Sequence, residues 1–212
     1  MANLSDTYIL AIESAISGGS ISLSTRGEII AESVGGTSVS RAEDLLPNIE
    51  TLLHESGVGR HEIRRIAISL GPGSYTGLRI GIATVLGLCR GLGIPHVGIP
   101  LINAIANFFP KDHTLLALPM GRSDICLADI SSATTKVLSM DDLKRDLEQR
   151  PNSHLLIHSD LLPDLIDVQP NLNDIGKNLA RYVAAAAGDQ QPSPTLDPIY
   201  IQNPRFGNAV PS

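Results

Sequence analysis

Hydrophobic and polar positions in the first half of the chain alternate between the periods of strands and helices. Three strands open the chain; in the second, Ile21 and Leu23 alternate with serines, as in a half-buried strand. A helix follows, with its apolar residues on one face and Gly57 as its C-cap. The expected elements are strands at 8–14, 19–25, 28–34, 65–70 and 96–99, and helices at 40–56, 77–92 and 101–109.

The start of the first helix has two interpretations. Ser40 and Glu43 have the spacing of a capping box. However, Pro47 fits poorly inside a helix that begins at Ser40, because proline lacks the N–H of an interior residue. The helix therefore either begins near Asp44 or is kinked.

The second half of the chain has weaker patterns. Residues 188–194 (GDQQPSP) predict a turn-rich linker, and the tail 207–212 is expected to fray. Periodicity alone thus supports a mixed α/β fold. The expected elements are strands at 113–119, 125–138, 154–158 and 198–201, and helices at 141–149, 161–166 and 175–187.

Composition describes an ordinary globular chain. Its 212 residues are 42% hydrophobic and 18% charged, enough to bury a core. Aromatic residues make up 3% and the net charge is −6, so direct binding of tRNA is not expected. Arg60, His61, Arg64 and Arg65 form a basic cluster, which is either a solvated loop and strand entry or a local exception to this acidity.

Cys89 and Cys126 lie far apart and have no CxxC neighbour, so buried reduced thiols are expected. The first residues lack the pattern of a signal peptide. No apolar run approaches the ~18 residues of a membrane span. We therefore expect a cytoplasmic protein without membrane contact.

Residues 69–81 (SLGPGSYTGLRIG) are the most informative stretch. They join an apolar strand to a long helix, and such turns present N–H groups that can bind an anion. Ser74 and Thr76 are both credible N-caps. The stretch lacks the Lys of a Walker A loop, and Thr76 stands where a dinucleotide fingerprint needs Gly or Ala. A structural turn and a phosphate-binding loop both remain open.

A nucleotide or a partner at this turn would meet its glycines and polar side chains. The candidate residues of the loop are Gly71, Gly73, Ser74, Thr76, Gly77 and Arg79.

The motif GPGSYTGLRIG, between its strand and its Ala/Gly-rich helix, resembles the signature of the TsaB family. ILAIESA near the start, EDLLP in the first helix and PIYI near the end agree in order. Members are small bacterial partners in making threonylcarbamoyladenosine on tRNA. The resemblance implies an α/β fold of the actin-like, sugar kinase and Hsp70 ATPase type with two lobes. The N-terminal lobe would span 1–109 and a reduced C-terminal lobe 110–212.

The resemblance also implies that metal chemistry is absent. The catalytic sibling TsaD carries two metal-binding histidines spaced HxxxH, where this chain has Asn103 and Asn107. Neutral amides do not replace imidazoles on such a metal. The family's Asp-Ala-Arg in the second lobe is altered to Met120, Gly121 and Arg122. We expect no catalytic residue, no metal and no required cofactor.

Glu13 ends the first strand, where active ATPases of this fold place an Asp facing phosphate and metal. The longer Glu would displace a metal-bound water network, and the alternative is an exposed or hydrogen-bonded structural Glu. His154 and His158 have a zinc-like spacing, but on a strand they would lie ~13 Å apart. With no third ligand, zinc is not expected.

Small residues recur along the helix after the turn, at Gly77, Gly81, Thr84, Gly87 and Gly91. Each interior Gly costs ~1 kcal/mol relative to Ala, so a packing reason is expected. The helix either packs closely on its own sheet or docks a partner's helix.

The resemblance implies a partner interface on helices 41–56 and 77–92, used with TsaD and in a homodimer. Leu45, Ile49 and Leu53 would add apolar contacts to the small residues of the second helix.

The expected function is that of a non-catalytic partner and activator of TsaD, in an assembly with TsaE. The assembly adds the threonylcarbamoyl group to the anticodon-adjacent adenosine, and this chain would meet tRNA only through it. The alternatives are a stand-alone nucleotide-binding enzyme, a glycoprotease-like metallopeptidase, or a sensor that holds ATP or ADP at the partner interface. The sequence lacks a complete ligand set for either enzyme.

Overall fold

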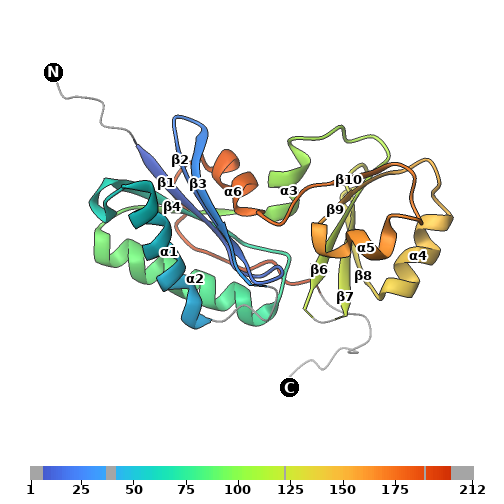
Figure 1. The fold of residues 1–212 in the computed structure, drawn as a ribbon, viewed down its shortest axis with the longest axis horizontal. Coiled ribbons are helices and arrows are strands. Elements are labelled where there is room, and N and C mark those ends of the chain that lie inside the picture. Colours follow the sequence, from blue (N-terminus) through green and yellow to red (C-terminus); the bar gives the residue numbers. More distant parts are fainter. Residues whose placement is uncertain (1–6, 37–41, 122, 189, 202–212) are drawn as a thin grey trace.

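The computed structural model describes residues 7–36, 42–121, 123–188 and 190–201, which form two lobes around two five-stranded sheets (Figure 1). The first sheet has the order β3-β2-β1-β4-β5, and the second has the order β10-β9-β6-β7-β8. Both sheets mix parallel and antiparallel pairs, as predicted for an α/β protein. No helix in the described ranges combines the length and the apolar character needed to cross a lipid bilayer.

The first lobe follows the predicted order of elements. Its elements are β1 (Tyr8–Glu13), β2 (Ser20–Thr25), β3 (Glu28–Val34), α1 (Ala42–Ser56), β4 (Ile63–Ser69), α2 (Tyr75–Leu92), β5 (His96–Ile99) and α3 (Leu101–Ala106). Gly57 ends α1 with a positive φ of 69°, as predicted for a C-cap. Ser74 caps α2, where its side chain accepts a hydrogen bond from the Gly77 N–H at 3.0 Å.

α1 is described from Ala42, midway between the two predicted starts at Ser40 and near Asp44, and Pro47 lies inside it. The predicted cap Ser40 lies outside the described residues, as do Arg122 and the tail 207–212.

The second lobe differs from its prediction in three places. Its elements are β6 (Thr114–Met120), β7 (Asp124–Asp129), β8 (Thr134–Leu138), α4 (Met140–Glu148), β9 (His154–Ile157), α5 (Leu162–Leu165) and β10 (Leu172–Asp174). The single strand expected at 125–138 is wrong, because a turn with Ala133 at a φ of 54° divides it into β7 and β8. β10 was not predicted. The strand expected at 198–201 is also wrong, since 190–201 has no strand.

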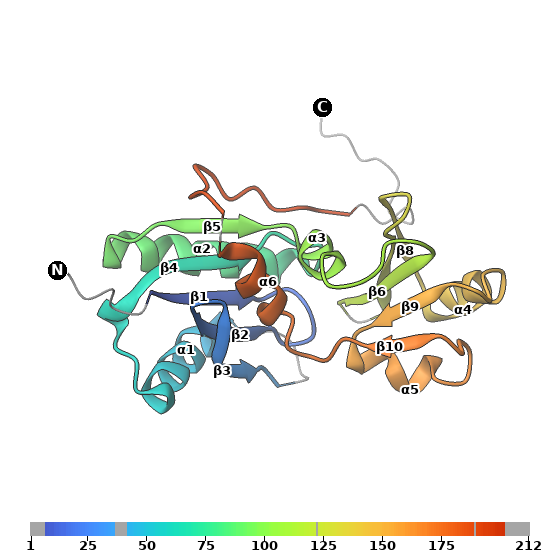
Figure 2. The same cartoon turned by 90° about the horizontal axis from the view of Figure 1, so that it is seen from above.

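α6 (Ala180–Ala187) returns to the first lobe, where it packs on β1, β2 and β4 (Figure 2). The helix expected at 175–187 therefore begins later than predicted. The strands of the first sheet precede the predicted boundary of 109/110 in the sequence, and those of the second sheet follow it. α6 also follows the boundary, but it packs on the first sheet. The division into 1–109 and 110–212 itself stays a prediction.

Three apolar cores hold these layers together. One lies under α1 and α2, and another lies under α4 and α5. The third joins the lobes, because it combines Ala11 and Ala67 of the first sheet with Leu116 and Leu156 of the second, around Val183 of α6. The lobes therefore share a continuous core.

Both cysteines are buried and free, as predicted. Burial raises the pKa of Cys89 to about 11 and that of Cys126 to about 12. Neither thiol is therefore ionised to a useful extent at neutral pH.

The basic cluster is partly structural. Arg65 donates from Nη1 to the carbonyls of Ala187 and Gln190, both at 2.8 Å, and so holds the end of α6. Arg60 forms an exposed ion pair with Glu50 at 2.7 Å. The expectation of a solvated cluster is therefore wrong for Arg65.

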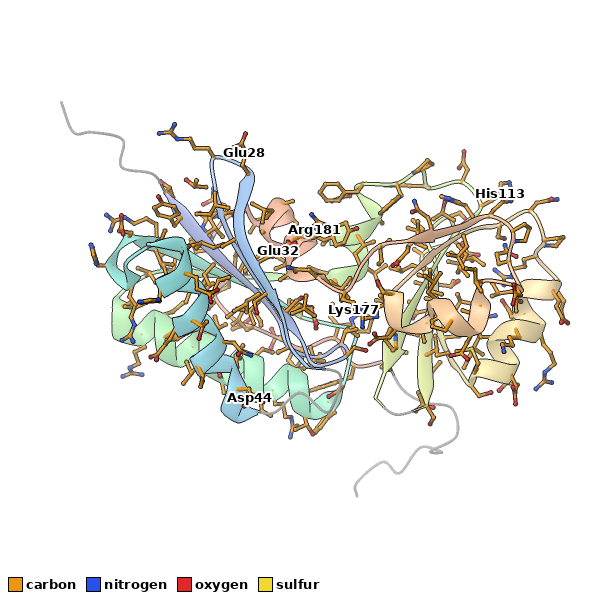
Figure 3. The ribbon with its side chains drawn as sticks, in the orientation of Figure 1. Glu28, Glu32, Asp44, His113, Lys177 and Arg181 are labelled. Atoms are coloured by element: carbon orange, nitrogen blue, oxygen red, sulfur yellow. The ribbon has the colours of Figure 1, made fainter. Side chains whose placement is uncertain are left out.

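Hydrogen bonds of the buried Asn178 side chain and of Ser20 form a clamp that holds the start of α6 against the first sheet. Asn178 Oδ1 accepts from the Ser22 hydroxyl at 3.2 Å, and its Nδ2 donates to Glu32 at 3.0 Å. Ser20 Oγ accepts from the Ala180 N–H at 3.0 Å. Figure 3 shows Glu32 and Arg181 near this junction.

Replacing Asn178 by Ala tests the clamp. The Ser22 hydroxyl and the backbone behind it would lose partners in a buried site, so the free energy of unfolding should fall by about 1–3 kcal/mol. Urea denaturation measures the change. Asn173→Ala, on the exposed side of β10, is the control and should alter it by less than about 0.5 kcal/mol. Equal effects of the two substitutions would contradict the clamp.

Candidate functional site

The glycine-rich turn between β4 and α2 lies against the turn 14–19 that joins β1 and β2. Ser74 N–H donates to the Ala15 carbonyl at 2.9 Å, and Ser14 Oγ donates to the Gly77 carbonyl at 2.9 Å. The two turns are thus joined by direct hydrogen bonds within one chain.

Glycine is needed where these turns meet, because no side chain fits between them. A Cβ on Gly73 would come within 3.0 Å of the Ala15 methyl group. A Cβ on Gly77 or Gly81 would approach Ser14 equally closely. Close packing within the chain therefore explains these glycines. From the sequence alone, a structural turn and a phosphate-binding loop were both possible explanations.

Gly71 is held differently. Its φ is 102°, its peptide bond to Pro72 is cis, and a Cβ would lie 2.8 Å from the Ile199 carbonyl oxygen. Its own carbonyl accepts from the Leu101 N–H at 2.9 Å, which links the turn to α3. Only glycine adopts this conformation at low cost.

Several donors of the glycine turn are already used internally. The Gly71 N–H donates to Ser69 Oγ at 3.2 Å, and the Gly77 N–H is taken by the cap Ser74. Thr76, the other candidate cap, is exposed at the start of α2. The Ser74 side chain therefore acts on its own helix, as expected for an N-cap.

Arg79 joins an exposed aromatic cluster. Its guanidinium carbon lies 3.8 Å from the centre of the Tyr75 ring, and its Nε donates to the Tyr200 hydroxyl at 3.3 Å. The two rings lie 4.9 Å apart. This cluster fastens residues 190–201 to the start of α2.

The predicted partner interface needs correction. Ile49 and Leu53 are buried in the core beneath α1 and α2. Gly77 and Gly81 are buried against Ser14, so none of these four residues is available to a partner.

The remaining predicted positions lie at or near the surface: Leu45 and Thr84 are half-buried, and Gly87 and Gly91 are exposed. The helical period of 3.6 residues turns Gly87 away from Gly81, so the small residues do not form one outward face. Sequence analysis missed the large apolar side chains that α1 and α2 do expose. Leu46 is 46% exposed and Leu86 is 43% exposed.

Glu13 closes the β1–β2 turn from within. Its Oε1 accepts from the Ala15 N–H at 2.7 Å and its Oε2 from the Ile16 N–H at 3.2 Å. Its strand partner is Ser20, whose hydroxyl reaches α6, so the Glu13 side chain lies on the α6 side of the sheet. Burial raises the pKa of Glu13 to about 7, against the opposing effect of the two hydrogen bonds.

Asp160, just after β9, faces the same turn from the second lobe. It accepts a hydrogen bond from Lys177 Nζ at 2.7 Å and another from the Ser17 side chain. Burial alone would raise the pKa of Asp160, but these hydrogen bonds outweigh it and hold the pKa below its ordinary value. Figure 3 shows Lys177 at the junction of the lobes.

His158 is buried behind Asp160, and its Nδ1 accepts from the Asp160 N–H at 3.2 Å. Burial lowers the pKa of His158, so it is neutral at pH 7. His154 is the first residue of β9 and His158 follows its last residue, so the stretch between the two histidines is a strand, as expected. Across the described part of the chain, no group of three or more His, Cys, Asp or Glu residues could hold a metal ion.

Two hollows flank these elements. One of about 290 Å³ lies at the β1–β2 turn, where Glu13, Gly18 and Gly19 line it together with Asn48 and Ile80. The other, of about 810 Å³, lies between the lobes, with Asn103 of α3 and Asn107, the residue after this helix, in its lining. The two asparagines that stand where the resemblance places histidines therefore present neutral amides to this groove.

Comparison with known proteins places this geometry in a family. A family model described as TsaD, tRNA N6-adenosine threonylcarbamoyltransferase, matches residues 32–143. The tRNA threonylcarbamoyladenosine biosynthesis protein TsaB of Haemophilus influenzae is 34% identical over 100 residues, and that of Escherichia coli is 33% identical over 98 residues. These alignments cover 46% of this chain and only 41% and 42% of the two relatives.

Other likenesses extend along the whole chain. An uncharacterized protein of Mycobacterium tuberculosis is 24% identical over 206 residues, which is 96% of both chains. The structure of YeaZ from Pseudomonas aeruginosa aligns with a TM-score of 0.59 at 18% identity, covering 92% of this chain and all of that one. The predicted two-lobed α/β fold is confirmed and is shared with YeaZ, whereas its assignment to the ATPase type with a reduced second lobe stays a prediction.

Alanine at two glycines of α2 separates the packing requirement from helix propensity. Gly81→Ala should lower the free energy of unfolding by about 1–3 kcal/mol, because its methyl group would overlap Ser14. Gly87→Ala is the matched control in the same helix and meets open space, so it should raise stability by about 0.5–1 kcal/mol. Thermal and urea denaturation measure both. Stabilisation by Gly81→Ala would contradict the packing.

Glu13 should make stability depend on pH. Its pKa is about 7 in the folded protein against an ordinary 4.5, so the folded state retains a proton that the unfolded state has lost. The free energy of unfolding should therefore fall as pH rises from 4.5 to 7, by on the order of 3 kcal/mol in total.

Glu13→Gln should remove this slope, whereas Glu50→Gln, at an exposed carboxylate, should keep it. Urea denaturation at several pH values provides the comparison. An unchanged slope in Glu13→Gln would show that another group titrates.

Proposed function

The chain belongs to the TsaB/YeaZ family, within the wider TsaD family, and we propose that it acts in tRNA threonylcarbamoyladenosine biosynthesis as a non-catalytic partner of TsaD. In this role it binds and activates TsaD, works with TsaE, and meets tRNA only through the assembly. The observation that carries the proposal is that α1 and α2 expose large apolar side chains, while the polar groups of the neighbouring turns serve their own chain.

The chemistry of the groove supports a non-catalytic role. Asn103 and Asn107 offer neutral amides at the positions where the resemblance places metal-binding histidines in TsaD. Met120 and Gly121 stand where the second-lobe motif of the family has Asp and Ala. TsaD would therefore supply the metal and the reacting groups.

The outer surface of α1 and α2 supports a docking role. Leu46 and Leu86 are exposed on two helices that cover the same face of the first sheet. Exposed Gly87 lets a partner's backbone approach α2 closely. Full burial of a leucine contributes about 1.5–3 kcal/mol, so two such anchors account for a substantial affinity.

The same surface would serve a homodimer, which then competes with TsaD. ATP or ADP at the partner interface stays a prediction, with Thr76 and Arg79 exposed at the nearby end of α2. No observation favours a stand-alone nucleotide-dependent enzyme or a metallopeptidase.

Charge on the docking helices tests this proposal. The double substitution Leu46→Asp, Leu86→Asp should weaken binding to TsaD from the same organism by at least about tenfold, because two buried anchors become charged. Size-exclusion chromatography with light scattering measures the complex, and a tRNA-modification assay on the isolated peak measures activity.

Ile166→Asp is the control, since Ile166 is 59% exposed after α5 on the other lobe. It should leave the complex and the modification intact. Loss of binding in this control with retention in the double variant would place the interface elsewhere, and no complex with the unaltered chain would remove the proposal.

A further inference from the structure

The ATPase-type fold that the sequence resemblance implies would hold a nucleotide with its phosphates at the β1–β2 turn. We infer that in this chain the carboxyl group of Glu13 takes the place of that phosphate on the N–H donors of the turn, which leaves the turn closed to nucleotides. The inference concerns this chain alone and does not depend on its pairing with TsaD.

The first reason is that both oxygens of Glu13 are in use. They accept from Ala15 and Ile16 at 2.7 Å and 3.2 Å. Successive N–H groups of a turn form a concave site that binds anions. A glutamate is long enough to reach N–H groups two and three residues ahead, and the side chain is 1% exposed. These N–H groups therefore donate to an acceptor that belongs to the chain itself, and the Glu13 carboxyl group is shielded from water.

The second reason is space. The glycine-rich turn, which would approach the phosphates from the other side, packs directly on Ala15. Gly73 has no room even for a methyl group, and Ser74 N–H is bonded to the Ala15 carbonyl at 2.9 Å. A phosphate cannot enter between the two turns without breaking this hydrogen bond, so an anion at these N–H donors can occupy only the space of the Glu13 carboxyl group.

The third reason is charge. The second lobe places the carboxylate of Asp160 against Ser17 of the same turn. Lys177, the cation beside it, is already paired with Asp160 at 2.7 Å. A nucleotide phosphate would thus meet a carboxylate where a binding site needs donors. The residues present do not fit the group that the fold implies.

Removing the carboxyl group should convert the turn into an anion site. Calorimetric titration and thermal denaturation at pH 8, where Glu13 is ionised, would use sodium tripolyphosphate and Mg-ATP as probes. The unaltered chain should show no saturable binding at millimolar concentrations. Glu13→Ala should bind tripolyphosphate at least about tenfold more tightly and gain thermal stability with it.

Ile66→Ala is the control for a cavity, because Ile66 is fully buried on the neighbouring strand β4. It should lower the unfolding temperature without any gain from anions. Sodium chloride at matched ionic strength corrects for general salt effects.

Submillimolar, saturable binding of Mg-ATP by the unaltered chain would overturn the inference. A folded Glu13→Ala that responds to tripolyphosphate no more than Ile66→Ala would overturn it as well. If Glu13→Ala does not fold, Glu13→Gln decides, because an amide accepts from only one of the two N–H groups and should allow weaker but measurable anion binding. Complex formation with TsaD is a separate measurement, so failure here leaves the proposed function standing.

Discussion

The contact between α2 and the β1–β2 turn is the constraint on which the first lobe depends. β1 lies in the middle of its sheet, between β2 and β4, so any displacement at its end would be passed to both neighbours. Gly77 and Gly81 allow α2 to approach Ser14 closely, and hydrogen bonds of Ser14 and Ala15 hold it there. A side chain at either glycine would force the helix away from the sheet, because packed interiors have little free volume. The glycine motif is therefore a condition of folding in this chain.

The shared core has a comparable effect on the whole molecule. Leu116 and Leu156 of the second sheet belong to the same apolar cluster as Ala11 of the first, with α6 between them. Arg65 holds one end of α6 and Asn178 the other. A hinge closure between the lobes would have to open this core and expose its apolar surface to water. The geometry favours a fixed arrangement of the lobes over a clamp.

Local signals in the sequence were sufficient for most of the first lobe. Ser74 and Gly57 mark helix ends through hydrogen bonds and backbone conformation that depend on a few neighbouring residues. β10 escaped prediction because it is three residues long and mostly polar. The turn that ends at Ala133 lacks Gly and Pro, and its local signal is Asp129, whose Oδ1 accepts from the N–H groups of Ser131 and Ser132. The position of α6 on the first sheet depends on contacts far apart in sequence, which periodicity does not encode.

The contacts of the candidate site, too, could not be predicted from local sequence patterns. A stripe of small residues indicates close approach, but it does not say whether the approaching group belongs to the same chain. Here Gly81 meets Ser14 within the chain, and Gly87 meets open space.

The sequence shows that Glu13 departs from the usual Asp, but its hydrogen bonds to the N–H groups of Ala15 and Ile16 depend on the fold of the turn. These internal uses are compatible with the role of a partner that we propose. Its turns bond to one another on the inside of the lobe, while the outer surface of α1 and α2 is separated from them by a layer of buried side chains such as Ile49 and Val85. Substitutions that close the turn therefore leave the outer surface unchanged. The docking surface that we propose and the β1–β2 turn therefore do not overlap, because buried side chains of α1 and α2 lie between them.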